Sequence, residues 1–193
     1  AMLGYQAFLF EAFDDADPNN VDYYTNIPTG GNYYHENYVQ TSGFNGKLSA
    51  NFATAYKNKL FLGLNLNAHF TDYTKLTSVY EGNNNPLYTS GLTVTDIQFD
   101  NELYTYGTGF SMNVGAIYKF TDNFRAGVAY ESPTWYNLND ELSQRLIVRT
   151  TDGTTDYQDV VNPNVVNIYE TYKIQTPSKW TFSGAYIFGK KGL

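Results

Sequence analysis

The sequence predicts an all-β protein, specifically an antiparallel up-and-down transmembrane β-barrel of which this chain forms a part. Three observations support this prediction: long runs of alternating apolar and polar residues, short turns that alternate with long polar connections, and aromatic residues beside the short turns. The clearest run extends from Gly107 to Trp135, where two alternating segments meet at a polar turn, residues 121–123. Because side chains alternate along a strand, each segment has one apolar face and one polar face.

Composition narrows the class of protein. Aromatic residues make up 18% of the 193 residues and charged residues only 16%, against about 25% charged in typical soluble domains. The net charge of -7 argues against a nucleic-acid partner, which would require a basic patch. The absence of cysteine excludes a disulfide framework and a thiolate metal site. No apolar run approaches the length of about 20 residues that a membrane-spanning helix needs.

Residues 1–32 are predicted to form a pre-strand segment and a loop. Leu3 to Phe13 is apolar and fits either a short helix or a strand, whereas Asp14 to Asn32 is rich in Asp, Asn, Pro and Gly and reads as a loop. The N-terminus lacks the basic region and the clear cleavage site of a signal peptide. We therefore expect the chain to be an internal piece of a longer protein.

The first loop contains a partial calcium-binding pattern. Asp15, Asp17 and Asn19 occupy the first three ligand positions of a calcium loop. Asn20 stands where that loop requires Gly, however, and Asn26 stands where it requires a bidentate Glu. The pattern is therefore interpreted as a solvated acidic loop, and no metal site is predicted.

Residues 33–193 are predicted to form a meander of about five long strands. The expected strands are about 38–56, 60–71, 97–120, 124–149 and 166–188. Short turns are expected at 57–59, 121–123 and 189–192, the last containing Lys190 and Lys191, and long polar loops at 72–95 and 150–164. Strands of roughly 20 residues exceed the 9–11 or so that cross a bilayer, so they would project beyond the membrane.

Aromatic residues gather at the two ends of the expected strands, as the two aromatic girdles of a membrane barrel would require. Beside the short turns these are Tyr56, Phe61, Phe120, Phe124 and Phe188. Towards the other ends they are Tyr73, Tyr80, Tyr104, Tyr106, Trp135 and Tyr136.

A soluble β-sandwich or small barrel is the simplest alternative, because its strands also alternate. Against it, the polar faces hold Asn, Ser, Thr and Gly rather than the Lys and Glu of a solvated surface. Single-chain membrane barrels have at least about eight strands. If the barrel prediction is right, the five or six strands of this chain belong to a larger barrel.

Three stretches resemble the FadL/TodX-type outer-membrane transport proteins, which carry hydrophobic compounds. They are GTGFSMNVGAIYKFTDNFRAGVAYESPTWY, KLSANFATAYKNKLFLGLNLNAHFTDY and TPSKWTFSGAYIFGKKGL, and they cover most of residues 44–136 and 176–193. The resemblance implies a 14-stranded barrel with an N-terminal hatch, an extracellular low-affinity groove and lateral release of ligand into the membrane. The hatch element and the C-terminal strands are not matched in this chain, so no ligand-binding residue is carried over.

The resemblance implies a class of transport rather than a cargo, since some members of the family are described as hemin receptors and one branch serves in protein secretion. We expect passive outer-membrane transport of hydrophobic small molecules, such as fatty-acid-like or aromatic compounds or hemin, through a plugged barrel. The expected partners are the apolar ligand and the lipid of the bacterial cell outer membrane, with no cofactor; a protein partner is left open. Tyr-rich outer loops, 73–106 and 134–172, could capture the ligand.

No catalytic constellation is found, so an enzyme is not predicted. The two histidines, His35 in a loop and His69 on a polar strand face, have no Cys or His partner at ligand spacing. His69 is interpreted as an ordinary interior residue rather than as a haem ligand. The rival functions are a soluble all-β module that binds carbohydrate or another ligand, and a barrel scaffold in a protein secretion complex.

Polar residues on the expected interior face are the candidate ligand-binding residues. They are Asn65, Asn67, Ser111, Asn113, Arg125 and Glu131. Arg125 and Glu131 share a face but lie about 20 Å apart along one strand, so they need partners on neighbouring strands. The candidates either satisfy one another inside the wall or line a permeation path, and the sequence leaves both readings open.

Overall fold

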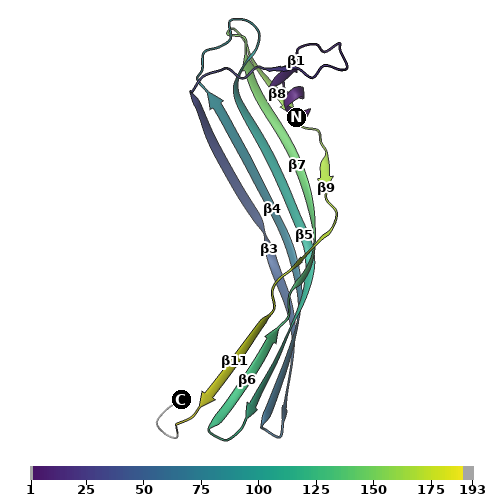
Figure 1. Ribbon diagram of the computed structural model, residues 1–193, viewed down its shortest axis with the longest axis vertical. Coiled ribbons are helices and arrows are strands. Elements are labelled where there is room, and N and C mark those ends of the chain that lie inside the picture. The colour runs from purple at the N-terminus through teal and green to yellow at the C-terminus, as the bar shows by residue number, and fades with distance from the viewer. Residues whose placement is uncertain (1, 189–193) are drawn as a thin grey trace. The chain divides into compact units, whose positions relative to one another are not determined.

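A computed structural model describes residues 2–188 of the chain, and it is an all-β protein with antiparallel sheets (Figure 1). Strands account for 68% of the described residues and helix for 3%, whereas typical soluble domains have about 20–25% strand. The prediction of an all-β antiparallel fold is confirmed. Within the described residues, no helix is long and apolar enough to cross a membrane.

The chain begins with a short helix and two short strands, which precede the long strands. The elements are α1 (Met2–Gln6), β1 (Phe10–Ala12), β2 (Tyr23–Thr25), β3 (Tyr33–Tyr56), β4 (Leu60–Asn83), β5 (Thr93–Lys119), β6 (Phe124–Glu131), β7 (Trp135–Thr151), β8 (Asp156–Val161), β9 (Val166–Ile168), β10 (Tyr172–Gln175) and β11 (Lys179–Tyr186). β1 pairs with β2, and the remaining strands form one large sheet.

The large sheet is a meander in which neighbours in sequence are neighbours in space. β3, β4 and β5 lie side by side, and β5 then pairs with both β6 and β7. β11 pairs with β6, while β8, β9 and β10 pair with β7. Across residues 2–188 the sheet is open, with β3 at one edge and the β8 to β11 row at the other.

Two neighbouring segments that contain proline interrupt the large sheet, one between β6 and β7 and the other between β10 and β11. Pro133 separates β6 from β7, and Pro177 separates β10 from β11, because proline has no N–H to donate to a strand ladder. Between the two breaks, the Thr134 N–H donates to the Thr176 hydroxyl at 2.8 Å, and the Thr176 N–H donates to the Thr134 carbonyl at 3.1 Å. The expected single strands 124–149 and 166–188 are therefore divided into shorter ones.

The two long polar segments that were predicted to be loops, 72–95 and 150–164, contain strand residues. Strand β4 continues to Asn83 and β5 begins at Thr93, so most of 72–95 is strand. Segment 150–164 likewise contains β8, which pairs with the end of β7. Both segments are mostly polar and carry only scattered apolar residues, such as Val94 and Val161, so they lack a long run of apolar alternation, while their backbone groups still pair with neighbouring strands. The ligand-capturing loop expected at 73–106 is accordingly mostly β4 and β5.

Both expected short turns in the described part of the chain are present. Lys57 and Asn58 have φ angles of 50° and 52°, and the Lys59 N–H donates to the Tyr56 carbonyl at 3.0 Å. Two successive positive φ angles are the signature of the type I′ turn that matches the twist of a hairpin. In the second turn, the Thr121 hydroxyl accepts the Phe124 N–H at 3.0 Å. The expected turn at 189–192, with Lys190 and Lys191, lies outside the described residues.

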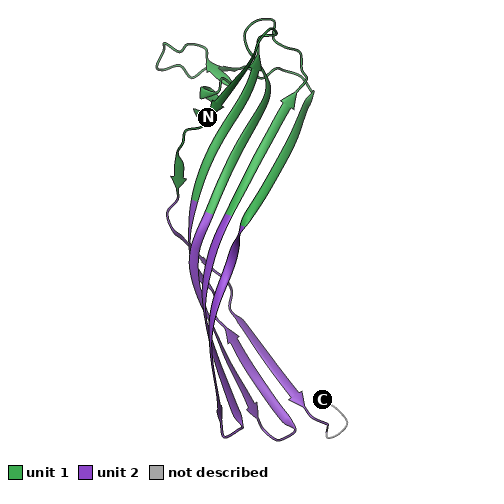
Figure 2. Cartoon of the chain, turned by 180° about the vertical axis from the view of Figure 1, so that it is seen from behind, with its two compact units in different colours: residues 1–42, 74–104, 141–168 green, residues 43–73, 105–140, 169–193 purple. Residues whose placement is uncertain are grey.

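The chain divides into two compact units, which are coloured separately in Figure 2. Unit 1 comprises residues 1–42, 74–104 and 141–168, and unit 2 comprises residues 43–73, 105–140 and 169–193. Strands β3, β4, β5 and β7 contribute residues to both units.

Unit 1 has a small apolar core that the N-terminal segment covers. Ala7, Val94, Leu146 and Val148 form the buried centre, with Leu3, Leu9, Ile27, Ile97, Phe99 and Val161 packed against it. Asn26 holds the N-terminal segment to the sheet. Its side-chain amide donates to the Phe8 carbonyl at 2.8 Å, and its backbone carbonyl accepts the Val94 N–H at 2.8 Å. The segment 14–32, expected as loop, thus contains β2, and the segment 3–13 contains both helix and strand.

Candidate functional site: the two faces of unit 2

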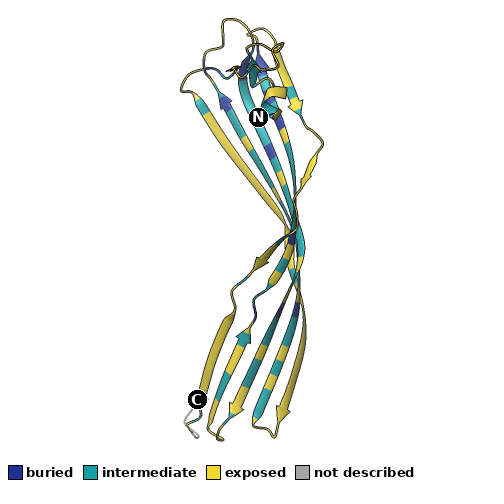
Figure 3. Cartoon of the chain, turned by 45° about the vertical axis from the view of Figure 1, so that its right-hand side comes forward, coloured by how far each residue is buried: buried dark blue, intermediate teal, exposed yellow. Residues whose placement is uncertain are grey.

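One face of unit 2 is apolar and aromatic and is largely uncovered. Its large exposed members, with their exposed fractions, are Leu48 (72%), Phe52 (59%), Phe70 (43%), Val114 (44%), Val128 (37%), Trp180 (62%) and Phe182 (77%). The side chains follow the strand alternation that the sequence analysis used, and Figure 3 shows how extensively β3 and β11 are exposed. A contiguous apolar surface of this kind marks contact with another apolar phase or partner.

An open groove of about 640 Å³ lies on this apolar face. Its lining includes Gly63, Gly115 and Ala116, which are small, together with Phe52, Val128 and Trp180, which are large. Trp180 also packs against Tyr130 at a ring-centroid distance of 4.6 Å. The groove offers apolar contact almost exclusively, so it does not fit a carbohydrate, which needs hydrogen-bonding partners.

Aromatic rings pack together beside the short turns of unit 2. Tyr118 and Phe120 are 4.8 Å apart between ring centroids, and Phe120 stacks on Phe124 at 5.5 Å. Tyr186 and Phe188 form a further pair at 4.9 Å. These pairs form an aromatic border at the turn end of unit 2, as the sequence analysis expected from the composition of that region.

The opposite face of unit 2 is polar, and its central side chains form a hydrogen-bond network. Asn67 lies at the centre with 2% of its surface exposed. It accepts from the Ser49 hydroxyl at 2.8 Å and donates to Asn113 at 2.8 Å and to Ser111 at 3.2 Å. The network therefore ties β3, β4 and β5 together through side chains as well as through the strand ladder.

His69 extends this network to β7. Its Nε2 lies 2.8 Å from the Ser111 hydroxyl, and its Nδ1 lies 3.4 Å from the Tyr136 hydroxyl. The Tyr136 ring also packs edge-on against the imidazole at a centroid distance of 5.6 Å. His69 is thus an internal member of the polar network, and the sequence analysis missed Tyr136 as its partner because the two are 67 residues apart.

The structure brings only part of the predicted site together. Asn67, Ser111 and Asn113 meet in one network, whereas Asn65 has a buried side-chain oxygen that accepts no hydrogen bond within the described residues. Arg125 stands opposite Lys119 on β5, and Glu131 stands opposite Asn113 on β5 and Lys179 on β11. Arg125 and Glu131 are exposed and are not members of the network around Asn67.

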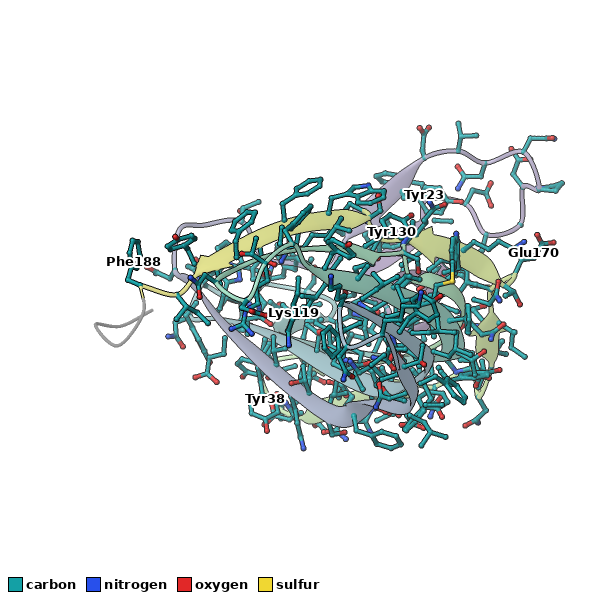
Figure 4. All side chains as sticks on the ribbon, turned by 90° about the horizontal axis from the view of Figure 1, so that it is seen from below. Tyr23, Tyr38, Lys119, Tyr130, Glu170 and Phe188 are labelled. Atoms are coloured by element: carbon teal, nitrogen blue, oxygen red, sulfur yellow. The ribbon has the colours of Figure 1, made fainter. Side chains whose placement is uncertain are left out.

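Lys119 and Tyr130 illustrate the two faces of unit 2. The side chains of these two residues, on the paired strands β5 and β6, lie on opposite sides of the sheet (Figure 4). The Lys119 ammonium is 4.9 Å from the centroid of the Phe61 ring, a cation–π contact. Lys119 is the direct partner of Arg125 in the register of β5 and β6, so two cationic residues stand opposite each other on the polar face.

Unit 1 carries a second set of polar contacts that sequence analysis missed. Arg145 donates to one oxygen of Asp100 through Nε at 3.0 Å and through Nη2 at 2.6 Å, and Arg149 pairs with Asp96. Burial alone would raise the pKa of Asp100, but hydrogen bonds from Ser78, Arg145 and Gln98 outweigh it and hold the pKa below 3.8. The two residues of each pair are 45 and 53 positions apart in the sequence, so no local sequence pattern predicts either contact.

The remaining candidates are engaged locally. His35, which is exposed, lies 3.1 Å from the half-buried Glu81. Asp15 accepts from the Tyr5 hydroxyl, and Asp17 accepts the Asn19 N–H at 2.9 Å, so the calcium-like positions serve contacts within their own segment. Across residues 2–188, no group of three or more His, Cys, Asp or Glu side chains is placed to hold a metal ion.

Taken together, the structure defines an open antiparallel sheet with an uncovered apolar face and a hydrogen-bonded polar face. Comparison of the sequence with models of known protein families and with curated proteins finds no match. The functional conclusion therefore depends on the chemistry of the two faces.

Proposed function

We propose that unit 2 is a membrane-spanning part of the wall of a bacterial outer-membrane β-barrel, and that the protein allows small hydrophobic molecules to cross that membrane passively. The exposed apolar face opposite a polar, hydrogen-bonded face carries this proposal. A fully exposed Leu, Val or Phe side chain forgoes about 1.5–3 kcal/mol of burial free energy, and the residues of this face, which are 37% to 77% exposed, each forgo a part of it. Contact with lipid recovers that free energy.

The dimensions of the shorter strands agree with a bilayer crossing. β6 and β11 have 8 residues each, close to the roughly 9–11 of a transmembrane strand. At one end of these strands lie the turn-side aromatics, and at the other lie the breaks at Pro133 and Pro177. An apolar band bordered by aromatic rings is the arrangement that lipid-facing strands adopt.

The polar face fits the interior of such a wall. Its central side chains satisfy one another, so they hold water less firmly than unpaired polar groups would. An apolar solute moving past a satisfied network displaces that water at low cost. Diffusion along such a surface needs no covalent step and no cofactor.

Membrane contact can be tested with the two tryptophans of the chain. In vesicles of phosphatidylcholine brominated on its acyl chains, we expect strong fluorescence quenching of Trp180, read in a Trp135→Phe variant. The matched Trp180→Phe variant reports Trp135 alone, which is 43% exposed. Protein that stays in the aqueous phase as a monomer, with Trp180 unquenched, would replace this proposal with the soluble binding module.

Transport can be tested separately in Gram-negative cells that produce the protein in the outer membrane. Intact outer membranes admit the apolar dye N-phenylnaphthylamine slowly, so we expect faster dye uptake than in cells with an empty vector. A polar dye of similar size should enter at the same rate in both. Membrane insertion with unchanged uptake of the apolar dye would favour a scaffold role in a secretion complex.

A further inference from the structure

Unit 1 contains a polar groove that the proposed transport does not use. It encloses about 690 Å³ and is lined by Ser78 of β4, by Gln98, Asp100 and Glu102 of β5, and by Arg145 of β7. Asn162, Asn164, Val165 and Val166 form one wall, and Tyr38 of β3 also lines the groove. We propose that this groove binds a neutral saccharide, independently of the transport function.

The polar floor of the groove is held in place by its own hydrogen bonds. Asp100 has 8% of its surface exposed, and it accepts from Arg145 and from Gln98, the latter at 3.1 Å. Gln98 donates in turn to Ser78 at 3.3 Å. A set of side chains fixed by mutual contacts can present its remaining hydrogen-bonding groups to a ligand without further ordering.

The accessible groups of the groove include both donors and acceptors. The Arg145 side chain is 47% exposed and donates to only one oxygen of Asp100, so its outer N–H groups remain at the surface. The amides of Asn162 and Asn164 supply both donors and acceptors, and the Glu102 carboxylate supplies acceptors. A ligand that both donates and accepts at several points matches this set, as sugar hydroxyls do.

The charge of the groove favours a neutral ligand over an anionic one. Two carboxylates, Asp100 and Glu102, and one guanidinium, Arg145, line the groove, which leaves one net negative charge in the lining. An anion would be repelled, and an ammonium ligand would leave the Arg145 and amide donors unmatched. The exposed ring of Tyr38 (59%) and the Val165 and Val166 side chains offer apolar surface for the C–H faces of a sugar ring.

Saturation-transfer difference NMR tests this proposal with maltotriose and chitotriose as neutral probes and trigalacturonate as an anionic probe. The protein is kept in dodecyldimethylamine oxide, a detergent without a sugar headgroup. We expect saturation transfer to at least one neutral probe, and little or none to trigalacturonate. No transfer to either trisaccharide, together with no response in the glycolipid arm described below, would overturn the proposal.

Variants localise the site. We expect Tyr38→Ala and Arg145→Gln each to weaken binding about tenfold, because each removes a main contact of the ring or of its hydroxyls. Arg145→Gln also disrupts the ion pair with Asp100, so a second test is needed. Asn164→Gly removes a side-chain amide of the groove without straining the backbone, because Asn164 has a φ of 51°, which glycine adopts freely. Tyr169→Ala, a tyrosine 50% exposed outside the groove, is the matched control and should bind normally. Equal binding by all four variants would contradict this location.

The saccharide could be free or could be the headgroup of a glycolipid. A second arm therefore measures binding to phosphatidylcholine vesicles with and without monogalactosyl diacylglycerol, again comparing Tyr38→Ala with Tyr169→Ala. Binding of free trisaccharides alone supports a soluble sugar, and a Tyr38-dependent response only to the glycolipid supports the headgroup. These readouts do not depend on dye uptake, so failure of the transport proposal leaves them interpretable.

Discussion

Asn67 is the single residue on which the polar face of unit 2 depends most. It is buried and makes side-chain hydrogen bonds to Ser49, Ser111 and Asn113 on the strands either side of it. Asn67→Ala would leave these neighbours without their partner, and we expect a loss of about 1–3 kcal/mol in the free energy of unfolding. Asn51→Ala, on an exposed position of the same face, is the control. Urea titrations in detergent measure both, and equal stabilities would show that the network adds nothing.

Asp152 gives unit 1 a local dependence on pH. Backbone N–H groups of Thr155 and Thr154 donate to its carboxylate at 2.7 and 2.8 Å and hold the pKa of Asp152 below 3.8. Because the folded pKa is the lower one, the stabilisation is present above 3.8 and is lost as the pH falls through the folded pKa.

Amide hydrogen exchange measures this effect directly. We expect the Thr154 and Thr155 amides to be protected at pH 7 and to lose protection in acid, beyond the intrinsic change in exchange rate. Asp152→Asn keeps a side-chain acceptor but does not titrate, so its protection should not change over the same range. A wild-type profile that matched the Asn variant would contradict the assigned cause.

At the scale of the element, the spacing between β5 and β7 depends on a glycine. A Cβ at Gly107 would lie 2.2 Å from the Asn137 carbonyl oxygen and 3.0 Å from the Leu138 Cα, which are backbone atoms that cannot rotate away. A Cβ at Gly184 of β11 would come no closer than 4.0 Å to any neighbour.

The two glycines therefore predict opposite responses to alanine. We expect Gly107→Ala to separate β5 from β7 and to lower the free energy of unfolding by about 1–3 kcal/mol. Gly184→Ala should be neutral or stabilising by about 0.4–1 kcal/mol, because it restricts the unfolded chain. Denaturant titration of the two variants gives the comparison, and a tolerated Gly107→Ala would show that the strands can move apart freely.

At the scale of the whole molecule, the decisive question is which solvent meets the apolar face. Phe182 is 77% exposed on that face, and its neighbour Ser183 is exposed on the other. In a bilayer, Phe182→Arg should destabilise the inserted protein by about 2–4 kcal/mol, whereas Ser183→Arg should cost much less. In water, arginine at either exposed site should change stability by no more than about 0.5 kcal/mol. Folding titrations into phosphatidylcholine vesicles separate the two cases, and equal effects would remove the lipid-facing assignment.

Sequence periodicity was sufficient for the all-β class, for the turns at 57–59 and 121–123, and for the two faces of unit 2. Apolar alternation with period two predicts a strand with one apolar face. A short polar turn between two such runs predicts a hairpin. It failed for the ends of β4 and β5 and for β8, where apolar residues are too few and too scattered to form a long alternating run. Periodicity also missed the breaks at Pro133, between β6 and β7, and at Pro177, between β10 and β11. These breaks arise because proline has no N–H to donate to a strand ladder.

Only the tertiary structure decided which polar residues meet. Asn67, Ser111 and Asn113 were expected on one face, and the strand pairing brings them into contact, while Arg125 and Glu131 on that face stay outside the network. His69 with Tyr136 and Asp100 with Arg145 are separated by 67 and 45 residues. A strand carries a local period that can be read from one segment, whereas a hydrogen bond between distant strands depends on register, which backbone pairing across the sheet determines.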